Sequence, residues 1–215
     1  MCELRNRKRN VTMLQRESVP KHTLELLEKL SEPASHLGFY LAGGTALALR
    51  FGHRISVDLD FFRFGEFEVD DVLEMVSKHA KNVQVVNRSS YSVSLIAEKT
   101  KIEFLRYDYK DLKPIDELER IHLCSLSDNA VMKLSAVAGR GSKKDFFDIA
   151  EIFNHLPLPI LLENYAEKYP DTDVFMILKS LTWFEDAESD PEPILKSKRT
   201  WEDVKKLILC EVSKL

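Results

Sequence analysis

Two short motifs with chemical potential lie close together in the first third of the chain. An apolar run ends in Gly43-Gly44-Thr45 and passes into Ala46–Arg50, a pattern that predicts a strand, a tight turn and a helix. Glycines before a helix N-terminus let the backbone approach a phosphate, whose charge is favoured by the helix dipole and by unpaired N–H groups. Thr45 is placed to cap this helix or to donate to the ligand. The motif predicts a phosphate-binding turn.

The second motif is an aspartate pair. The run Ile55–Phe62 alternates like a strand, which puts Asp58 and Asp60 on one face of the sheet. Two neighbouring carboxylates repel each other, and a divalent cation, Mg²⁺ or Mn²⁺, removes that conflict. Either motif alone is weak evidence, because Gly-Gly before a helix is usually only a turn and Asp-x-Asp is often a solvated loop end. Their order and short separation point to metal-assisted phosphate chemistry.

This stretch resembles the nucleotidyltransferase family of AbiEii/AbiGii-type toxins, a minimal-nucleotidyltransferase branch of the DNA polymerase β superfamily. The matching segments are 41–47 (Leu-Ala-Gly-Gly-Thr-Ala-Leu), 52–54 (Gly-His-Arg) and 56–62 (Ser-Val-Asp-Leu-Asp-Phe-Phe). The resemblance implies transfer of a nucleoside monophosphate from NTP to an acceptor hydroxyl. It also implies a toxin of a toxin–antitoxin system, with RNA or tRNA as acceptor and a cognate antitoxin as partner. In this interpretation Gly43, Gly44 and Thr45 cradle the β and γ phosphates, while Arg54 offsets triphosphate charge.

A third carboxylate lies further along the chain. Apolar-alternating runs at 83–86, 91–97 and 102–107 predict antiparallel strands that extend the sheet. Glu103 stands between two apolar residues in the last run, where a solvent-facing Glu would be the plainer interpretation. Beside the aspartate pair, it can bind metal and take the proton of the attacking hydroxyl. The resemblance also places the third acid of the family at this Lys-Ile-Glu-Phe position.

Helical patterns of the second half carry further charged residues. On pattern alone, Lys133, Asp145 and Asp148 are solvated helix surface. The AbiEii-type toxins carry a Lys-x-x-Ala helix followed by a Lys/Arg-Asp-x-x-Asp helix, matched here by segments 133–136 and 144–148. The resemblance therefore implies that Lys133 contacts the triphosphate and that the two aspartates lie near the nucleotide.

The remaining patterns define the expected fold. A helix over Val19–Leu30 with an exit loop at Pro33 precedes the central motifs, and a helix over Glu68–His79 follows them. Three helical patterns close the chain, and the acidic stretch Glu185–Glu192 separates the last two. We expect an α+β protein with a nucleotidyltransferase-type mixed, largely antiparallel sheet flanked by helices, followed by an all-helical C-terminal half.

The chain divides, on this interpretation, into a nucleotidyltransferase core at 19–113 and a helical C-terminal region at 114–215 that completes the nucleotide site. The division falls at Pro114, which begins a charged, linker-like segment running to Arg120. The three final helices carry no recognisable chemistry, and a cap over the site or a partner surface is their expected role.

Composition limits the remaining choices. A formal net charge of −4 leaves no global basic field, so any RNA contact must come from a local patch. The basic cluster Arg5–Arg9 is either such a patch or part of a solvated tail. Three cysteines without metal-ligand spacing favour a reducing compartment. No apolar stretch reaches membrane-spanning length. We therefore expect a cytoplasmic protein without a membrane partner.

Two other functions stay open at this point. An antibiotic-type nucleotidyltransferase that modifies a small molecule shares the Gly-Gly and Asp-x-Asp arrangement, and the size of the acceptor is not visible in the sequence. A module that binds a nucleotide or a partner without turnover is the second alternative. The presence of Asp58, Asp60 and Glu103 together argues against it, since loss of a carboxylate would mark decay of the activity.

Overall fold

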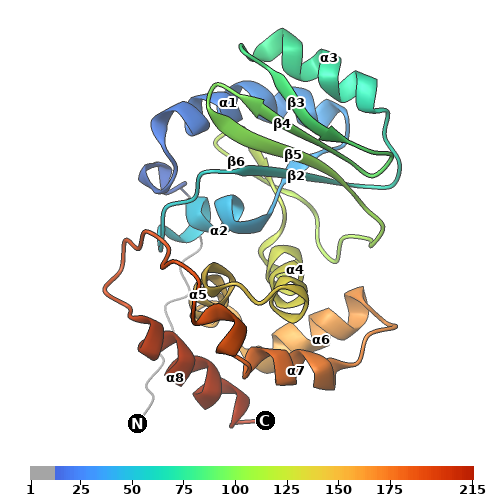
Figure 1. The fold of residues 1–215 in the computed structure, drawn as a ribbon. Helices are drawn as coiled ribbons and strands as arrows, with labels where there is room; N and C mark the ends of the chain where they lie inside the picture. The colour runs from blue at the N-terminus through green and yellow to red at the C-terminus, as the bar shows by residue number, and fades with distance from the viewer. Residues whose placement is uncertain (1–12) are drawn as a thin grey trace.

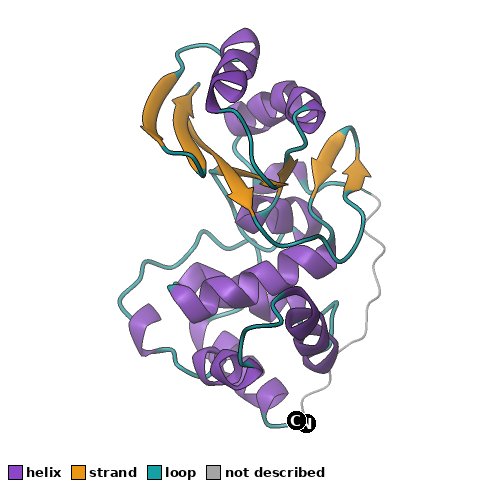
Figure 2. Cartoon of the chain, turned by 90° about the vertical axis from the view of Figure 1, so that its right-hand side faces the viewer, coloured by secondary structure: helices purple, strands orange, loops and turns teal. Residues whose placement is uncertain are grey.

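The computed structural model describes residues 13–215, and the cluster Arg5–Arg9 lies outside the described residues. In the view of Figure 1, a sheet with its covering helices lies above a wholly helical part. Figure 2, turned by a quarter, shows the same separation into a mixed part and a helical part. The predicted α+β class is confirmed.

The sheet is mixed and mostly antiparallel. Its strands are β1 (Tyr40–Leu41), β2 (Leu59–Phe64), β3 (Gln84–Arg88), β4 (Ser92–Ala97), β5 (Thr100–Tyr107), β6 (Asp116–Leu118) and β7 (Ile121–Leu123). They lie in the order β3-β4-β5-β2-β1-β7-β6. Strand β2 runs parallel to β5, and β1 runs parallel to β7, whereas the other neighbours are antiparallel. The parallel β2–β5 pair sits at the middle of the sheet and brings two separate acidic positions together.

One face of the sheet carries the larger part of its core. Helices α1 (Lys21–His36) and α3 (Val69–His79) cover this face and bury apolar side chains against the strands. Helix α1 runs through Pro33, where an exit loop was expected. Ala34 is fully buried in the core, and the N–H groups of Leu37 and Gly38 close the helix end on the carbonyls of Ala34 and Ser35. This packing offsets the hydrogen bond that proline cannot donate.

The helical part has its own apolar core. Its members are α4 (Leu126–Gly139), α5 (Lys143–Ile152), α6 (Leu158–Lys168), α7 (Val174–Leu181) and α8 (Trp201–Val212). Helix α2 (Gly43–Phe51) joins the two parts, because Leu47 packs in the helical core while Ala46 and Leu49 pack in the sheet core. Short 3₁₀ turns lie at η1 (Arg16–Ser18) and η2 (Glu185–Ala187). Among residues 13–215, no helix has the length and apolar character needed to cross a membrane.

Two local predictions differ from the structure. Strand β2 begins at Leu59, not at Ile55, because the preceding residues pair with a distant segment instead. The N–H of Ile55 donates to the carbonyl of Ile194 (2.8 Å), and the N–H of Lys196 donates to the carbonyl of His53 (3.0 Å). Asp58 therefore lies in the segment just before the strand.

The linker expected at 114–120 instead contains β6 and leads into β7. Ile121 and Leu123 are buried and extend the sheet core next to β1. The turn residues Glu119 and Arg120 both adopt positive φ, a conformation that hairpins usually assign to Asn or Gly. These charged residues carry no hairpin signal, and the sheet extends to Leu123, ten residues beyond the expected boundary at 113.

Candidate active site

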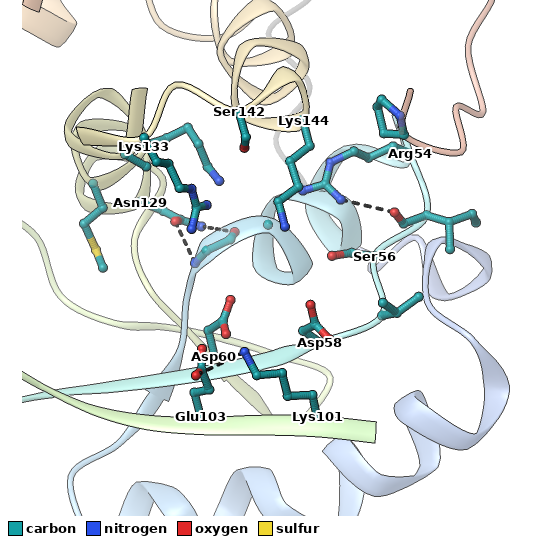
Figure 3. Close-up of a pocket in the computed structure, with 18 of the residues that line it drawn as sticks. Arg54, Ser56, Asp58, Asp60, Lys101, Glu103, Asn129, Lys133, Ser142 and Lys144 are labelled. Carbon is teal, nitrogen blue, oxygen red and sulfur yellow. Dashed lines mark hydrogen bonds and ion pairs between the residues drawn. The ribbon is translucent and has the colours of Figure 1, made fainter. Parts of the chain in front are cut away.

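A cleft of about 660 Å³ opens between the sheet and the helical part, and Figure 3 shows the side chains that line it. Strands β2 and β5 provide one side, together with the start of α2. Helix α4, the first residues of α5 and the connection between them provide the other side. Residues 54–58 and 190–194 complete the lining. The cleft therefore draws on both parts of the chain.

The three predicted carboxylates line this cleft. Asp58 precedes β2, Asp60 lies on it, and the parallel register sets Asp60 beside Glu103 of β5. Burial raises the pKa of Asp60, and the neighbouring charges of Glu103 and Asp58 raise it further. Mutual repulsion of this kind is relieved when a cation binds among the carboxylates.

The chemistry of these donors fits a divalent cation. Hard oxygen ligands are what Mg²⁺ and Mn²⁺ prefer. The carboxylate of Glu103, however, accepts a hydrogen bond from Ser94 Oγ (2.9 Å) and lies 3.1 Å from Lys101 Nζ. In the part of the chain that the structure describes, no three acidic, histidine or cysteine side chains are gathered closely enough to hold an ion as they stand. All three carboxylates can therefore hold one ion only after their side chains move.

The glycines at the start of α2 make room for functional side chains. A Cβ on Gly43 would lie 2.9 Å from Asp60 Oδ2, and Gly43 has a φ of +67° that favours glycine. A Cβ on Gly44 would collide with Arg54 Nη2. The absence of side chains at Gly43 and Gly44 thus leaves space for the Asp60 carboxylate and the Arg54 guanidinium next to the N-terminus of α2.

Asn129 of α4 was not predicted, and it fixes this turn. Its side chain is fully buried, its Oδ1 accepts the N–H of Gly43 (3.0 Å), and its Nδ2 donates to the carbonyl of Gly43 (3.2 Å). The first N–H groups of a helix have no partner within the helix. Because Asn129 takes the one from Gly43, those of Gly44 and Thr45 are the ones left for an anion. The sequence offered one local signal, an Asn followed by apolar residues at the start of a helix.

The side chain of Thr45 does not line the cleft, which corrects its expected role as a phosphate contact. Thr45 is 1% exposed, and its hydroxyl donates to the carbonyl of Asp58 (2.5 Å) and lies 2.9 Å from Ser56 Oγ. It therefore ties the segment that carries Asp58 to the first turn of α2. The contribution of its side chain is to position the Asp58 carboxylate.

The aspartates of α5 are buried anchors and not a solvated surface. Asp148 has no exposed surface and accepts hydrogen bonds from Arg54 Nε (2.7 Å) and Nη2 (2.9 Å) in a bidentate pair. Lys133 Nζ lies 2.9 Å from Asp148 Oδ2, and His53 Nε2 lies 2.7 Å from Asp148 Oδ1. Burial alone would raise the pKa of Asp148, but the charges of Lys133 and Arg54 outweigh it and hold the pKa well below its usual range.

Asp145, one turn earlier, holds the second pair of cations. Lys133 Nζ donates to its Oδ1 (3.0 Å), Arg140 Nε donates to its Oδ2 (2.8 Å), and Ser142 Oγ donates to the same oxygen (2.6 Å). These contacts lower the pKa of Asp145 despite its burial. Neither Asp145 nor Asp148 lines the cleft, so the structure does not bring them to the nucleotide directly. They hold Arg54, Lys133 and Arg140, which do line it.

Lys144 is a second residue that the sequence interpretation overlooked, although it lies in the matched Lys-Asp-x-x-Asp segment. It lines the cleft from the first turn of α5 and is exposed. Within residues 13–215, no ion pair or hydrogen bond joins its amine to another residue, whereas Arg54, Lys133 and Arg140 are all paired with aspartates. Lys144 is thus the cation with its charge fully available to a ligand.

Residues 188–196, which precede α8, form a strap along the cleft. Lys143 is buried and fastens it, with its N–H on Asp190 Oδ2 (2.9 Å) and its Nζ on the carbonyls of Glu188 (3.1 Å) and Asp190 (2.7 Å). The far end of the strap is held by the backbone pairing with residues 53–55. The strap residues 190–194 therefore form a fixed part of the cleft lining, and the expected cap over the site is a loop rather than a helix.

Comparisons with known proteins agree with this arrangement. Residues 25–209 match the family described as nucleotidyl transferase AbiEii toxin, type IV TA system. A protein of Aquifex aeolicus (strain VF5), described as uncharacterized, is 34% identical over 202 residues, which cover 89% of this chain and 95% of that protein.

Two solved structures share the fold. MenT4, a nucleotidyltransferase toxin from Mycobacterium tuberculosis H37Rv, aligns with a TM-score of 0.62 at 16% identity and covers 91% of this chain and 86% of its own. JHP933 from Helicobacter pylori aligns with a TM-score of 0.54 at 17% identity over 94% of this chain and 93% of its own. The family match extends over most of the chain, from α1 to α8, and includes every carboxylate of the cleft. The chain is therefore a nucleotidyltransferase and belongs to the AbiEii toxin family of type IV toxin–antitoxin systems.

Proposed function

We propose that this protein transfers a nucleoside monophosphate from an NTP to an acceptor hydroxyl, in a reaction that depends on Mg²⁺ or Mn²⁺. The observation that supports this most strongly is one cleft with opposite charges on its two sides. Asp58, Asp60 and Glu103 line the sheet side, and Lys144 with the anchored cations lines the helical side. A triphosphate with its metal ion needs both kinds of charge at once.

The phosphate groups are held by the start of α2 and by the cations of the second half. The N–H groups of Gly44 and Thr45 and the helix dipole favour phosphate oxygens. Lys144 supplies a free charge, and Lys133 and Arg54 contribute charges whose positions are fixed by buried aspartates. Asp145 and Asp148 thus act on the nucleotide through these cations.

The carboxylates carry the chemical step. Asp58 and Asp60, together with Glu103, hold the metal, which when bound neutralises triphosphate charge. The acceptor oxygen bonds to the α-phosphorus, and the bond from that phosphorus to the oxygen bridging to the β-phosphate breaks, so pyrophosphate leaves. Glu103 takes the proton of the acceptor hydroxyl.

RNA, and tRNA in particular, is the acceptor that we propose, and a cognate antitoxin is the proposed protein partner. Both proposals rest on membership in a toxin family of type IV toxin–antitoxin systems.

The test is incubation with each of the four NTPs, labelled at the α-phosphate, in the presence of Mg²⁺. Parallel reactions contain total RNA, purified tRNA, or hydroxyl-bearing small molecules of the aminoglycoside class. Label on RNA with at least one NTP is the expected result, and the length of the labelled species identifies tRNA. Label on the small molecules alone would refute the RNA acceptor, and absence of label in every reaction would refute the transfer.

A further inference from the structure

Lys101 lies beside the carboxylates, although no motif points to it. It precedes Glu103 by two residues on β5, so both side chains leave the same face of the strand. Its Nζ lies 3.1 Å from Glu103 Oε1, and its side chain, which is 49% exposed, lines the cleft. Figure 3 shows its amine pointing toward Glu103 on the sheet side of the cleft.

The sheet register places like charges side by side around this lysine. Ser94 of β4, Glu103 of β5 and Asp60 of β2 stand in one row across three strands. Adjacent like charges in such a row destabilise a sheet. Asp58, which precedes β2, lines the same cleft as Lys101. The lysine therefore pairs with Glu103 and shares the cleft with both aspartates.

The other cations of the cleft have different partners. Arg54 and Lys133 are bound to Asp148, and Arg140 is bound to Asp145. Among the described residues that line the cleft, Lys101 is the cation with an ion pair to one of the three catalytic carboxylates. The Lys101 amine and the Ser94 hydroxyl both contact Glu103 Oε1. Together they fix the orientation of this carboxylate.

We propose that Lys101 is a built-in counter-ion of the carboxylate site, which holds Glu103 before a metal binds and yields it when the metal arrives. The proposal rests on the proposed function, because it assumes that these carboxylates take a divalent cation. Lys101 is a positioning residue on this view. Its charge lowers the metal affinity of the site, and its presence keeps three neighbouring carboxylates stable without an ion.

The size of the effect follows from Coulomb's law. For an assumed separation on the order of 7 Å between the lysine charge and a divalent ion, a water-like medium gives a weakening of binding of about five- to tenfold. Removing the charge while keeping the aliphatic stem should therefore tighten metal binding by that factor. A lysine that lies well beyond the Debye length of about 8 Å from the ion would change it by less than about twofold, because salt screens its charge.

The experiment is calorimetric titration of Mn²⁺ into the full chain without NTP, for wild type, Lys101→Met and Lys101→Arg. Lys29→Met is the matched control, because Lys29 is 48% exposed and also lies 3.1 Å from a glutamate, Glu98, on the surface away from the cleft. Lys101→Met should bind Mn²⁺ five to ten times more tightly than wild type. Lys101→Arg and Lys29→Met should bind as wild type does.

Lys101→Gln provides a second neutral variant if Lys101→Met is poorly folded. If Lys101→Met and Lys101→Gln both bind Mn²⁺ with the affinity of wild type, the counter-ion role is overturned. The proposed function would still stand. Tightening by Lys29→Met to the same extent would also overturn it, since the effect would then be one of general charge. No Mn²⁺ binding by any of these proteins would overturn the metal site itself and this inference with it.

Discussion

Replacing Lys133 with alanine should destabilise the fold as well as weaken NTP binding. The sequence pattern alone predicted that Lys133 lies on a solvated helix surface, where substitution costs little stability. In the structure its side chain is 5% exposed and bridges two fully buried carboxylates, Asp145 (3.0 Å) and Asp148 (2.9 Å). Burial would lower the pKa of Lys133, but the charges of Asp148 and Asp145 raise it, so the amine stays charged.

The magnitude follows from the charges that remain. Removing one partner of a buried ion pair costs about 3–5 kcal/mol, because the other charge is left uncompensated. Arg54 still binds Asp148 and Arg140 still binds Asp145, which favours the lower end of that range. For a chain of this size each kcal/mol lowers the melting temperature by about 2–4 °C. Lys133→Ala should therefore melt roughly 6–12 °C below wild type.

Thermal melts at pH 7, with urea titrations for the free energy, measure this directly. The matched control is Lys179→Ala on α7, an exposed lysine far from the cleft lining, which should melt within about 1 °C of wild type. NTP affinity is compared at a temperature where both variants are folded. A Lys133→Ala protein that melts with wild type would refute the buried ion cluster as a source of stability.

Three further outcomes follow from the same contacts. Glu103→Gln should abolish turnover while NTP affinity, measured calorimetrically, stays within about threefold of wild type; a parallel loss of both would mean that Glu103 serves metal and NTP binding and not proton transfer. Lys144→Ala should weaken NTP binding about tenfold with an unchanged melting temperature, and unchanged affinity would exclude a phosphate contact. Because the folded-state pKa values of Asp145 and Asp148 are depressed, the stability that they contribute is complete above the unfolded value of about 4 and is lost as pH falls below it. Urea midpoints should therefore hold from pH 7 to about 5 and fall below about pH 4, and an equal fall in Asp148→Asn would contradict this assignment.

The carboxylate side of the site was predictable because it depends on short-range periodicity. The spacing of Asp58 and Asp60 and the alternation around Glu103 place these residues on strands or next to them. The parallel register of β2 and β5 then sets Asp60 beside Glu103. The outline of the fold was predictable for the same reason, since most helices and strands carry their own apolar pattern.

The cationic side was harder to predict because it depends on which element covers which face. Helical spacing shows that Asp145 and Asp148 share one face of α5, but it does not show that Arg54 and Lys133 close over it. Buried carboxylates are tolerated only with such partners, and these partners come from distant segments. Asn129 escaped notice likewise, because its hydrogen bonds on Gly43 link two helices 86 positions apart.

Backbone pairing between distant segments explains the differences at strand ends. Residues 53–55 have an apolar and polar pattern compatible with a strand, but their backbone groups bond to the strap near residue 195. No local pattern identifies that partner. The same strap gives the cleft a lining from the last quarter of the chain, where the sequence carries no chemical motif.

The most direct test of metal-dependent nucleotidyl transfer follows two labels through one reaction. Wild-type protein is incubated with RNA, Mg²⁺ and NTP labelled either at the α-phosphate or at the γ-phosphate, and the Asp58→Asn, Asp60→Asn double variant and a chelator serve as controls. We expect the α label on the RNA, the γ label in pyrophosphate, and no transfer in either control. A γ label on the RNA, or α-label transfer that persists in the double variant, would contradict nucleotidyl transfer at these carboxylates.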